Sequence, residues 1–308
     1  MSGRTAARAA RRRRAVAARR GLAFVALLAA AFSAAGQDAA TLRNQFAAAR
    51  AQPGADIFGR PLYLRSTEAP DHLQGDVYAL VDRPYAQVRE ALTPPAHWCA
   101  VLILHLNVKY CRASGDPAAL DVGVGRKIDQ PLSEAYWVHF AYRVASAGDD
   151  FMRLTLKAPS GPLSTKDYRL VFEAAPYDAK RSVLHMGYGY GYGFAARVGM
   201  QAYLSTLGSA KVGFSVVGRN PDGSPEHVGG VRGVVERNTM RYYFAIEAYL
   251  AELALPPGQR AAQAAQDWFD LTEKYPEQLH ELDRDAYLQM KQRECERERT
   301  EAPPAQGG

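Results

Sequence analysis

The chain has 308 residues, of which 47% are hydrophobic, and it contains 17 Tyr, 11 Phe and three Trp. This composition excludes a disordered or collagen-like chain. Three cysteines exclude a disulfide-dense mini-scaffold and a metal site with four cysteine ligands. The formal net charge of +6 would by itself suggest a nucleic-acid partner.

The N-terminus is the source of this positive charge. Eight arginines precede Gly21, an apolar run covers residues 21–32, and small residues follow at 33–36. A basic region, a short apolar region and small residues at the cleavage site are the three parts of a secretory signal peptide. The apolar region of about 12 residues is too short to span a bilayer. We therefore expect cleavage before Gln37 and a periplasmic or secreted protein without a transmembrane span. The alternatives are an uncleaved anchor and an arginine-rich disordered arm.

Removal of residues 1–36 changes the electrostatic argument. It takes away eight of the 38 basic residues and none of the 32 acidic ones, which leaves a net charge of −2. Nucleic-acid binding needs a basic patch on the folded body. We therefore expect no nucleic-acid partner.

Export also bears on the three cysteines. Cys99 and Cys111 would lie in an oxidising compartment, which favours a disulfide between them. Such a bridge would stabilise the fold by about 3 kcal/mol on the loop-entropy model. The alternative is two buried thiols. Cys295 lies in a charged run and has no expected partner within the chain, so it either cross-links two chains or stays unpaired.

The chain after the signal segment begins with a predicted helix and an edge strand, together spanning residues 37–74. Residues 38–51 are alanine-rich with apolar residues at helical spacing, and Asp38 or Thr41 could cap that helix. Residues 61–66 predict an edge strand, where proline is tolerated. The elements predicted next are a strand at 75–82, a helix at 84–92, a helix or turn from residue 94, and strands at 108–111 and 120–127.

The middle of the chain has the most regular pattern. Apolar and polar residues alternate between turn-forming stretches, which predicts an antiparallel sheet with one covered face and one wet face. His139, Arg153, Glu173 and His185 fall on the predicted wet face. A helical insertion is predicted at 194–207. The five predicted strands are 135–145, 151–157, 167–174, 182–192 and 211–217.

Residues 231–253 form the strongest predicted helix, because their apolar residues follow the 3.6-residue period and prolines come directly afterwards. We expect this helix to lie across the covered face of the sheet in one α+β domain over residues 75–254. Val234, Ile246 and Leu250 should then be buried.

Two segments follow this domain. Residues 255–295 predict a helical extension with large apolar residues, among them Trp268 and Tyr275, at helical spacing. Residues 296–308 are rich in Glu, Arg, Pro and Gly and predict a disordered tail.

The order of these elements resembles the START-like or helix-grip superfamily. The resemblance rests on residues 75–92 (GDVYALVDRPYAQVREAL), on the nearby Trp98 and on the long helix. The superfamily includes START lipid-transfer domains, polyketide cyclase-like proteins and birch-pollen-allergen-like proteins. It implies a curved sheet around the helix and a cavity for sterols, phospholipids or other hydrophobic ligands. The insertion at 194–207 and the extension after Leu255 depart from the pattern, and the insertion could cover the cavity or fill it.

Motifs for catalysis are missing from the sequence, which has no HExxH, GxSxG or P-loop. The seven histidines show no i,i+4 pair on a predicted helix, so we expect no metal site and no cofactor. His97 and His105 flank the Trp98 segment and are the best site candidates among them. Gly187 and Gly189 alternate with tyrosines, which predicts either an aromatic wall with a close approach behind it or a curved strand.

Charged residues on the long helix leave two interpretations open. Arg237 and Arg241 could face the cavity and hold an anionic headgroup. The favoured alternative is a solvated helix face that also carries Arg232 and Glu236, because long charged side chains are rarely buried.

The sequence as a whole predicts an exported, non-catalytic binding or carrier protein for a hydrophobic, lipid-like ligand held between the sheet and the long helix. Arg241 is the expected polar anchor. One alternative is a cavity enzyme of the cyclase or hydrolase type, and the other is a structural envelope protein that docks a protein partner at residues 268–290. The residues expected to line the cavity are Tyr142, Phe172, Tyr188, Tyr190 and Phe214.

Overall fold

The computed structural model describes residues 38–52, 56–193 and 211–301. The predicted signal peptide and the predicted helical insertion at 194–207 lie outside the described residues. None of the helices within these ranges combines the length and apolarity needed to cross a membrane. The α-helices are α2 (Ala39–Arg50), α3 (Tyr85–Leu92), α4 (Pro95–Leu102), α6 (Gly230–Ala251), α7 (Pro257–Thr272), α8 (Pro276–Leu279) and α9 (Arg284–Thr300).

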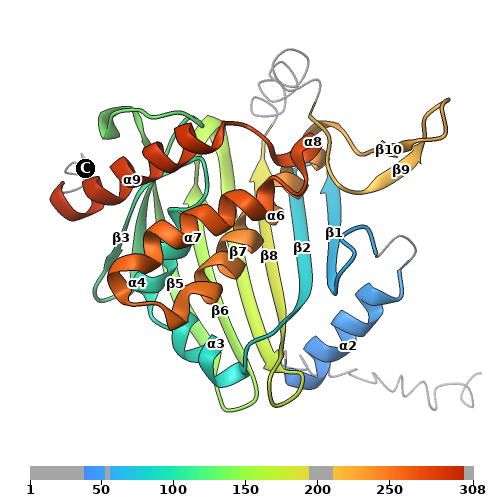
Figure 1. Ribbon diagram of the computed structural model, residues 1–308, viewed down its shortest axis with the longest axis horizontal. Coiled ribbons are helices and arrows are strands. Elements are labelled where there is room, and N and C mark those ends of the chain that lie inside the picture. The colour runs from blue at the N-terminus through green and yellow to red at the C-terminus, as the bar shows by residue number, and fades with distance from the viewer. Residues whose placement is uncertain (1–37, 53–55, 194–210, 302–308) are drawn as a thin grey trace, which may run out of the picture. The chain divides into compact units, whose positions relative to one another are not determined.

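Eight strands form one open antiparallel sheet, with the order β1-β2-β8-β7-β6-β5-β4-β3 (Figure 1). Strands β3 to β8 follow the chain as a meander, and the β1–β2 hairpin joins the meander through β2 and β8. This arrangement confirms the predicted α+β class. The strands are β1 (Leu62–Ala69), β2 (His72–Val81), β3 (Val108–Ser114), β4 (Ala119–Val124), β5 (Tyr136–Ala147), β6 (Met152–Ser160), β7 (Thr165–Pro176) and β8 (Ser182–Tyr192).

The register of the sheet follows the predicted two-residue alternation. Leu156 pairs with Tyr142 on one side and with Leu170 on the other, and Leu170 pairs with Tyr188. Residues paired across antiparallel strands project from the same face. Apolar side chains of β5 to β8 therefore form one continuous covered face.

The fifth predicted strand, at residues 211–217, is not part of this sheet. The Glu236 carboxylate accepts hydrogen bonds from the backbone N–H groups of Phe214 (2.6 Å) and Ser215 (2.9 Å), so these groups are satisfied without a strand partner. The end of the predicted segment belongs to strand β9 (Val216–Arg219). This strand pairs with β10 (Pro225–His227) in a separate hairpin. The prediction of a main-sheet strand from the apolar–polar alternation of residues 211–217 was therefore wrong.

Helix α6 lies across the covered face of the sheet, as predicted (Figure 1). Ile246 and Leu250 are buried, whereas Val234 is only partly buried. The helix comes very close to β2 at Gly75, where an added Cβ would lie 2.2 Å from Thr239 Oγ1. Glycine is needed at this point because it alone leaves room for the helix.

The C-terminal extension covers the outer side of α6. Helix α7 packs on α6, and α9 packs on α7 and β3. Arg241, which is 1% exposed, bonds to Leu279 and Glu281 of this extension. Glu236 and Arg237, which are 0% and 4% exposed, bond instead to residues 211–215. The favoured expectation of a solvated helix face was therefore wrong.

The apolar residues of the segment 268–290 belong to the core of this same chain. Trp268, Leu279 and Met290 are each 1% exposed and Tyr287 is fully buried, so they present no apolar stripe to a partner. Helix α9 also continues to Thr300, five residues into the segment predicted to be disordered.

The second face of the sheet is only partly wet, because α2 packs on β1, β2, β7 and β8. Leu42 and Phe46 of α2 join Tyr63 and Tyr78 in a second apolar core, and Asp38 caps the helix. Glu173 and His185 on this face are 1% and 8% exposed. Their assignment to a solvated surface was wrong, since strand alternation does not reveal which part of a face a distant helix covers.

Helices α3 and α4 close one end of the covered face. Trp98 is fully buried in α4, and its indole nitrogen donates to the Leu92 carbonyl at the end of α3 (2.8 Å). Cys99 of α4 and Cys111 of β3 are joined in a disulfide, with 5.1 Å between their Cα atoms. Cys295 is a free thiol.

Candidate functional site

A cavity of about 880 Å³ lies between the sheet and α6. This volume falls in the range of small-molecule binding sites, about 300–1,000 Å³. Its sheet wall comes from β4 to β8, its helical wall from α6, and one end from the loops after α4 and β4. The apolar side chains of its walls include Leu102, Val122, Val138, Phe140, Leu156, Tyr168, Leu170, Tyr188, Tyr190, Val234 and Tyr242.

Four tyrosines form an aromatic cluster in these walls. Tyr168 and Tyr190 stack with ring centroids 5.2 Å apart, and Tyr188 meets Tyr242 of α6 at 5.0 Å. Burial raises the pKa of Tyr188 and Tyr242 well above the ordinary value of 10. The phenols are therefore neutral at physiological pH and provide a flat, largely apolar surface.

The structure brings three of the six expected binding residues to this cavity, namely Tyr188, Tyr190 and Arg241. The two tyrosines point to the covered face, whereas Gly187 and Gly189, which alternate with them along β8, lie at positions facing the other side of the sheet. Built side chains at these glycines would lie 2.9 Å from Asp76 Oδ1 and 2.3 Å from Gln74 Oε1, respectively. The close approach behind the aromatic wall thus comes from β2 side chains.

The other three expected residues lie in the packed core. The Tyr142 hydroxyl donates to the Thr93 carbonyl (2.6 Å), and Phe172 meets the Trp98 ring edge-on with centroids 5.6 Å apart. Phe214 packs against aromatic rings outside the cavity lining. The alternation of a strand shows which face a residue occupies, but α3 and α4 decide which part of that face is filled.

One end of the cavity is charged. Arg241 is 1% exposed and binds Glu281 at 2.7 Å, and Lys127 binds the same carboxylate oxygen. Burial alone would raise the pKa of Glu281, but Arg241 and Lys127 lower it below its usual value. No sequence signal located Lys127 or Glu281, because one lies in a loop and the other in the extension.

His105 lies at the same end and is 2% exposed. Its Nδ1 accepts the backbone N–H of Asn107 (3.1 Å), and its ring stacks on Tyr242 with centroids 4.5 Å apart. Burial, and next the charge of Arg241, hold the pKa of His105 well below 6.5. His105 is therefore neutral at physiological pH. His97, the other candidate histidine, bonds to the Ala91 carbonyl and does not line the cavity.

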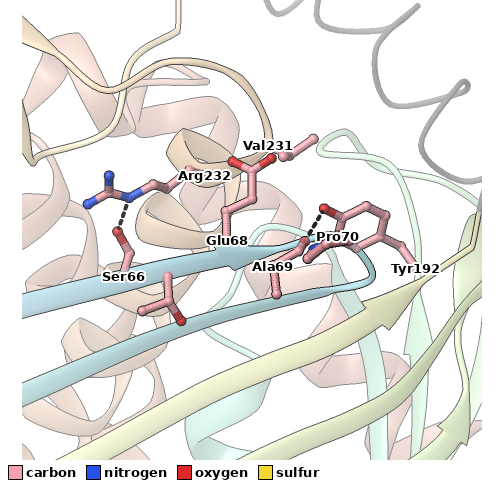
Figure 2. Close-up of a pocket in the computed structure, with 8 residues that line it drawn as sticks. Ser66, Glu68, Ala69, Pro70, Tyr192, Val231 and Arg232 are labelled. Atoms are coloured by element: carbon pink, nitrogen blue, oxygen red, sulfur yellow. Dashed lines mark hydrogen bonds between the residues drawn. The ribbon is translucent and has the colours of Figure 1, made fainter.

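A second hollow, of about 750 Å³, lies between the end of β1, the end of β8 and the first turn of α6. Figure 2 shows Arg232 donating from Nε to the Ser66 hydroxyl (2.8 Å) and the Tyr192 hydroxyl donating to the Ala69 carbonyl (3.0 Å). These polar side chains are bonded across the hollow. Among the described residues that line this hollow, Tyr192 is the one aromatic residue, so these residues do not form an aromatic wall like that of the cavity beneath α6.

A third hollow, of about 270 Å³, lies on the opposite face of the sheet beside α2. Asp76, Arg153, Glu173 and His185 line it and form ion pairs with one another. Within residues 38–52, 56–193 and 211–301, no group of three or more His, Cys, Asp or Glu side chains is arranged to hold a metal ion.

No protein-family model and no curated protein matches this chain. Solved structures similar to it include a norcoclaurine synthase point mutant from Thalictrum flavum, with 10% identity and a TM-score of 0.33, covering 46% of this chain and 91% of that one. A conserved protein from Geobacillus kaustophilus has 13% identity and a TM-score of 0.34, with coverage of 58% and 95%. Human StAR-related lipid transfer protein 5 has 8% identity and a TM-score of 0.30, with coverage of 54% and 87%.

The helix-grip fold predicted from the sequence is evident in the arrangement itself. An open antiparallel sheet packs on the long helix α6, and the cavity lies between them. The chain adds the extension from α7 to α9, which covers α6 and supplies Glu281 to the charged end of the cavity.

Proposed function

We propose that this is an exported protein that binds a hydrophobic ligand, without catalysis, in the cavity between the sheet and α6. The observation that carries the proposal is the apolar cavity of about 880 Å³ with its wall of neutral tyrosines. An apolar pocket with a few convergent polar groups is the usual form of a small-molecule site. The basic and apolar N-terminal segment supports export.

The direct test is native mass spectrometry of the protein purified from its own host. A hydrophobic molecule should co-purify and be released on unfolding. The neutral fluorophore N-phenyl-1-naphthylamine should bind the emptied protein and be displaced by that molecule. If nothing co-purifies and the fluorophore does not bind, the cavity is not a ligand site and the proposal is wrong.

A matched pair of variants locates the binding. Tyr190→Leu alters the cavity wall, whereas Tyr142→Leu makes the same change in the packed core. We expect Tyr190→Leu to weaken fluorophore binding about three- to tenfold, which is the usual contribution of an aromatic pair. Tyr142→Leu should lower thermal stability and leave the affinity within about twofold of the wild type. Equal effects on affinity would place the ligand elsewhere.

N-terminal sequencing of the protein from its host tests the proposed export. The mature chain should begin near Gln37. Recovery of intact Met1 from the cytoplasm would contradict it.

A cavity enzyme is the second candidate, because two titratable residues in the cavity have perturbed pKa values. Burial, and next the charge of Arg241, lower the pKa of Lys127 to about 8 and that of His105 well below its ordinary value. Such perturbations are a feature of catalytic sites. Incubating the co-purified molecule with fresh protein distinguishes the two. A change in its mass would favour the enzyme, and recovery of the intact molecule would favour the carrier.

A further inference from the structure

The charged residues that line the cavity are predominantly basic. Six charged side chains line it in the described part of the chain, and five of them are Arg or Lys. Glu134 pairs with Arg126 at the exposed rim, and Glu281 is shared by Lys127 and Arg241. The sequence has no aspartate or glutamate outside the described ranges. Basic side chains therefore outnumber the acidic ones, Glu134 and Glu281, at this cavity.

His105, which lines the same cavity, carries an unsatisfied hydrogen-bond donor. Because its neutral ring accepts the Asn107 N–H at Nδ1, the ring hydrogen is on Nε2. This Nε2 is buried and has no hydrogen-bond partner among the residues that the structure describes. A buried donor without a partner is unfavourable by about 1–3 kcal/mol and is rare in native proteins. A hydrogen-bond acceptor on a bound molecule would satisfy the His105 Nε2 donor.

The cations at this end are already held in place. Glu281 contacts Arg241 at 2.7 Å and Lys127 through the same oxygen, and Arg241 also donates to the Leu279 carbonyl (3.3 Å). A site whose groups are fixed before binding loses less conformational freedom when a ligand arrives. Glu281 thus orients two positive charges with one carboxylate, so these three groups together carry a net charge of +1.

We propose that the cavity selects apolar ligands that end in an anionic oxygen group, a carboxylate or a phosphate, which accepts a hydrogen bond from His105 Nε2 and is neutralised by Lys127 and Arg241. The apolar part of the ligand lies along the tyrosine wall. Charge-assisted hydrogen bonds to such groups are stronger than neutral ones. This inference rests on the proposed function, and it adds the chemical class of the ligand.

Isothermal titration calorimetry with three ligands of one chain length tests the headgroup. Dodecanoate, dodecyl phosphate and dodecan-1-ol share the same tail and are used below their aggregation limits. We expect at least one anion to bind wild-type protein about tenfold or more tightly than the alcohol. Which anion binds more tightly distinguishes a carboxylate ligand from a phosphate ligand. Equal affinity for the alcohol and both anions would overturn the inference while leaving the proposed function intact.

Three variants test the residues. Lys127→Met removes a charge at the site, and Lys157→Met makes the same change on the exposed outer face of β6. His105→Phe keeps a ring against Tyr242 and removes the donor.

We expect Lys127→Met and His105→Phe each to weaken anion binding about tenfold and to change alcohol binding by less than about twofold. Lys157→Met should change neither. If Lys127→Met and Lys157→Met behave alike, the charge is not part of the site and the inference is wrong. Lys127 is partly exposed, so its replacement keeps this test valid even if His105→Phe fails to fold. If neither these ligands nor the neutral fluorophore binds, the proposed function fails, and the inference fails with it.

Discussion

Replacing His185 with glutamine probes the charge network on the sheet face opposite the cavity. His185 Nδ1 lies 2.7 Å from Glu173 Oε2, and its Nε2 lies 2.9 Å from Asp76 Oδ1. Arg153 binds the second oxygen of Glu173 at 2.7 Å, and Tyr78 stacks on the imidazole with centroids 4.6 Å apart. Because both ring nitrogens face carboxylates, the geometry favours the protonated imidazolium.

The sign and size of the effect follow from the pKa of His185. Burial alone would lower this pKa, but the hydrogen bonds and charges of Asp76 and Glu173 raise it from 6.5 to about 9. The stabilisation is fully present below about pH 6.5 and is lost as the pH rises through about 9, because the folded protein then holds a proton that the unfolded chain has released. The difference between the two pKa values corresponds to about 3 kcal/mol.

Urea unfolding at pH 6, 7.5 and 9 measures this contribution as the difference between wild type and His185→Gln. Taking the difference cancels other titrating groups that the two proteins share. We expect the free energy of unfolding of wild type to exceed that of His185→Gln by about 3 kcal/mol at pH 6 and by less than about 1 kcal/mol at pH 9. His139→Gln is the matched control, since His139 contacts Asp121 on an exposed part of the same face. It should change stability by less than about 0.5 kcal/mol at each pH.

A difference between wild type and His185→Gln that stays constant from pH 6 to pH 9 would refute the reasoning. It would mean that the imidazole is not charged in the folded protein, whatever its packing contributes. A pH-dependent loss of the same size in His139→Gln would also refute it, because the effect would then not depend on burial between two carboxylates.

Two further substitutions test buried contacts. Glu294→Gln should destabilise the protein by about 3–5 kcal/mol in urea unfolding, because the carboxylate of Glu294 is the shared partner of the buried ammonium groups of Lys109 and Lys291. The loss should be smaller at pH 9 than at pH 7, since burial lowers the pKa of Lys109 to about 8, and a loss below about 1 kcal/mol at pH 7 would contradict the argument. Gly75→Ala should lower the free energy of unfolding by about 1–3 kcal/mol, because the added Cβ clashes with Thr239 Oγ1. In the double variant Gly75→Ala/Thr239→Ala, thermal unfolding should show that part of this stability is recovered. No recovery would show that the clash is not with that hydroxyl.

Local patterns in the sequence determined much of the sheet and its long helix. The two-residue alternation placed Leu156, Leu170 and Tyr188 on one face, and their pairing in the structure follows it. The 3.6-residue period located α6, and the prolines after it marked its end. These features depend on neighbouring residues in the chain, and for that reason they can be predicted without knowing the rest of the fold.

The tertiary structure alone decided where the charged groups lie. Arg241 is buried because α7 to α9 cover the outer side of α6, and its partner Glu281 is 40 residues further along the chain. Residues 211–217 do not join the main sheet: the Glu236 carboxylate accepts from the N–H groups of Phe214 and Ser215, and the Gly213 N–H donates to the Val228 carbonyl. His185 is buried on the part of the sheet where α2 packs on β8. In each case a residue's exposure depends on a segment far away in the sequence, and periodicity within one element carries no information about what packs on it.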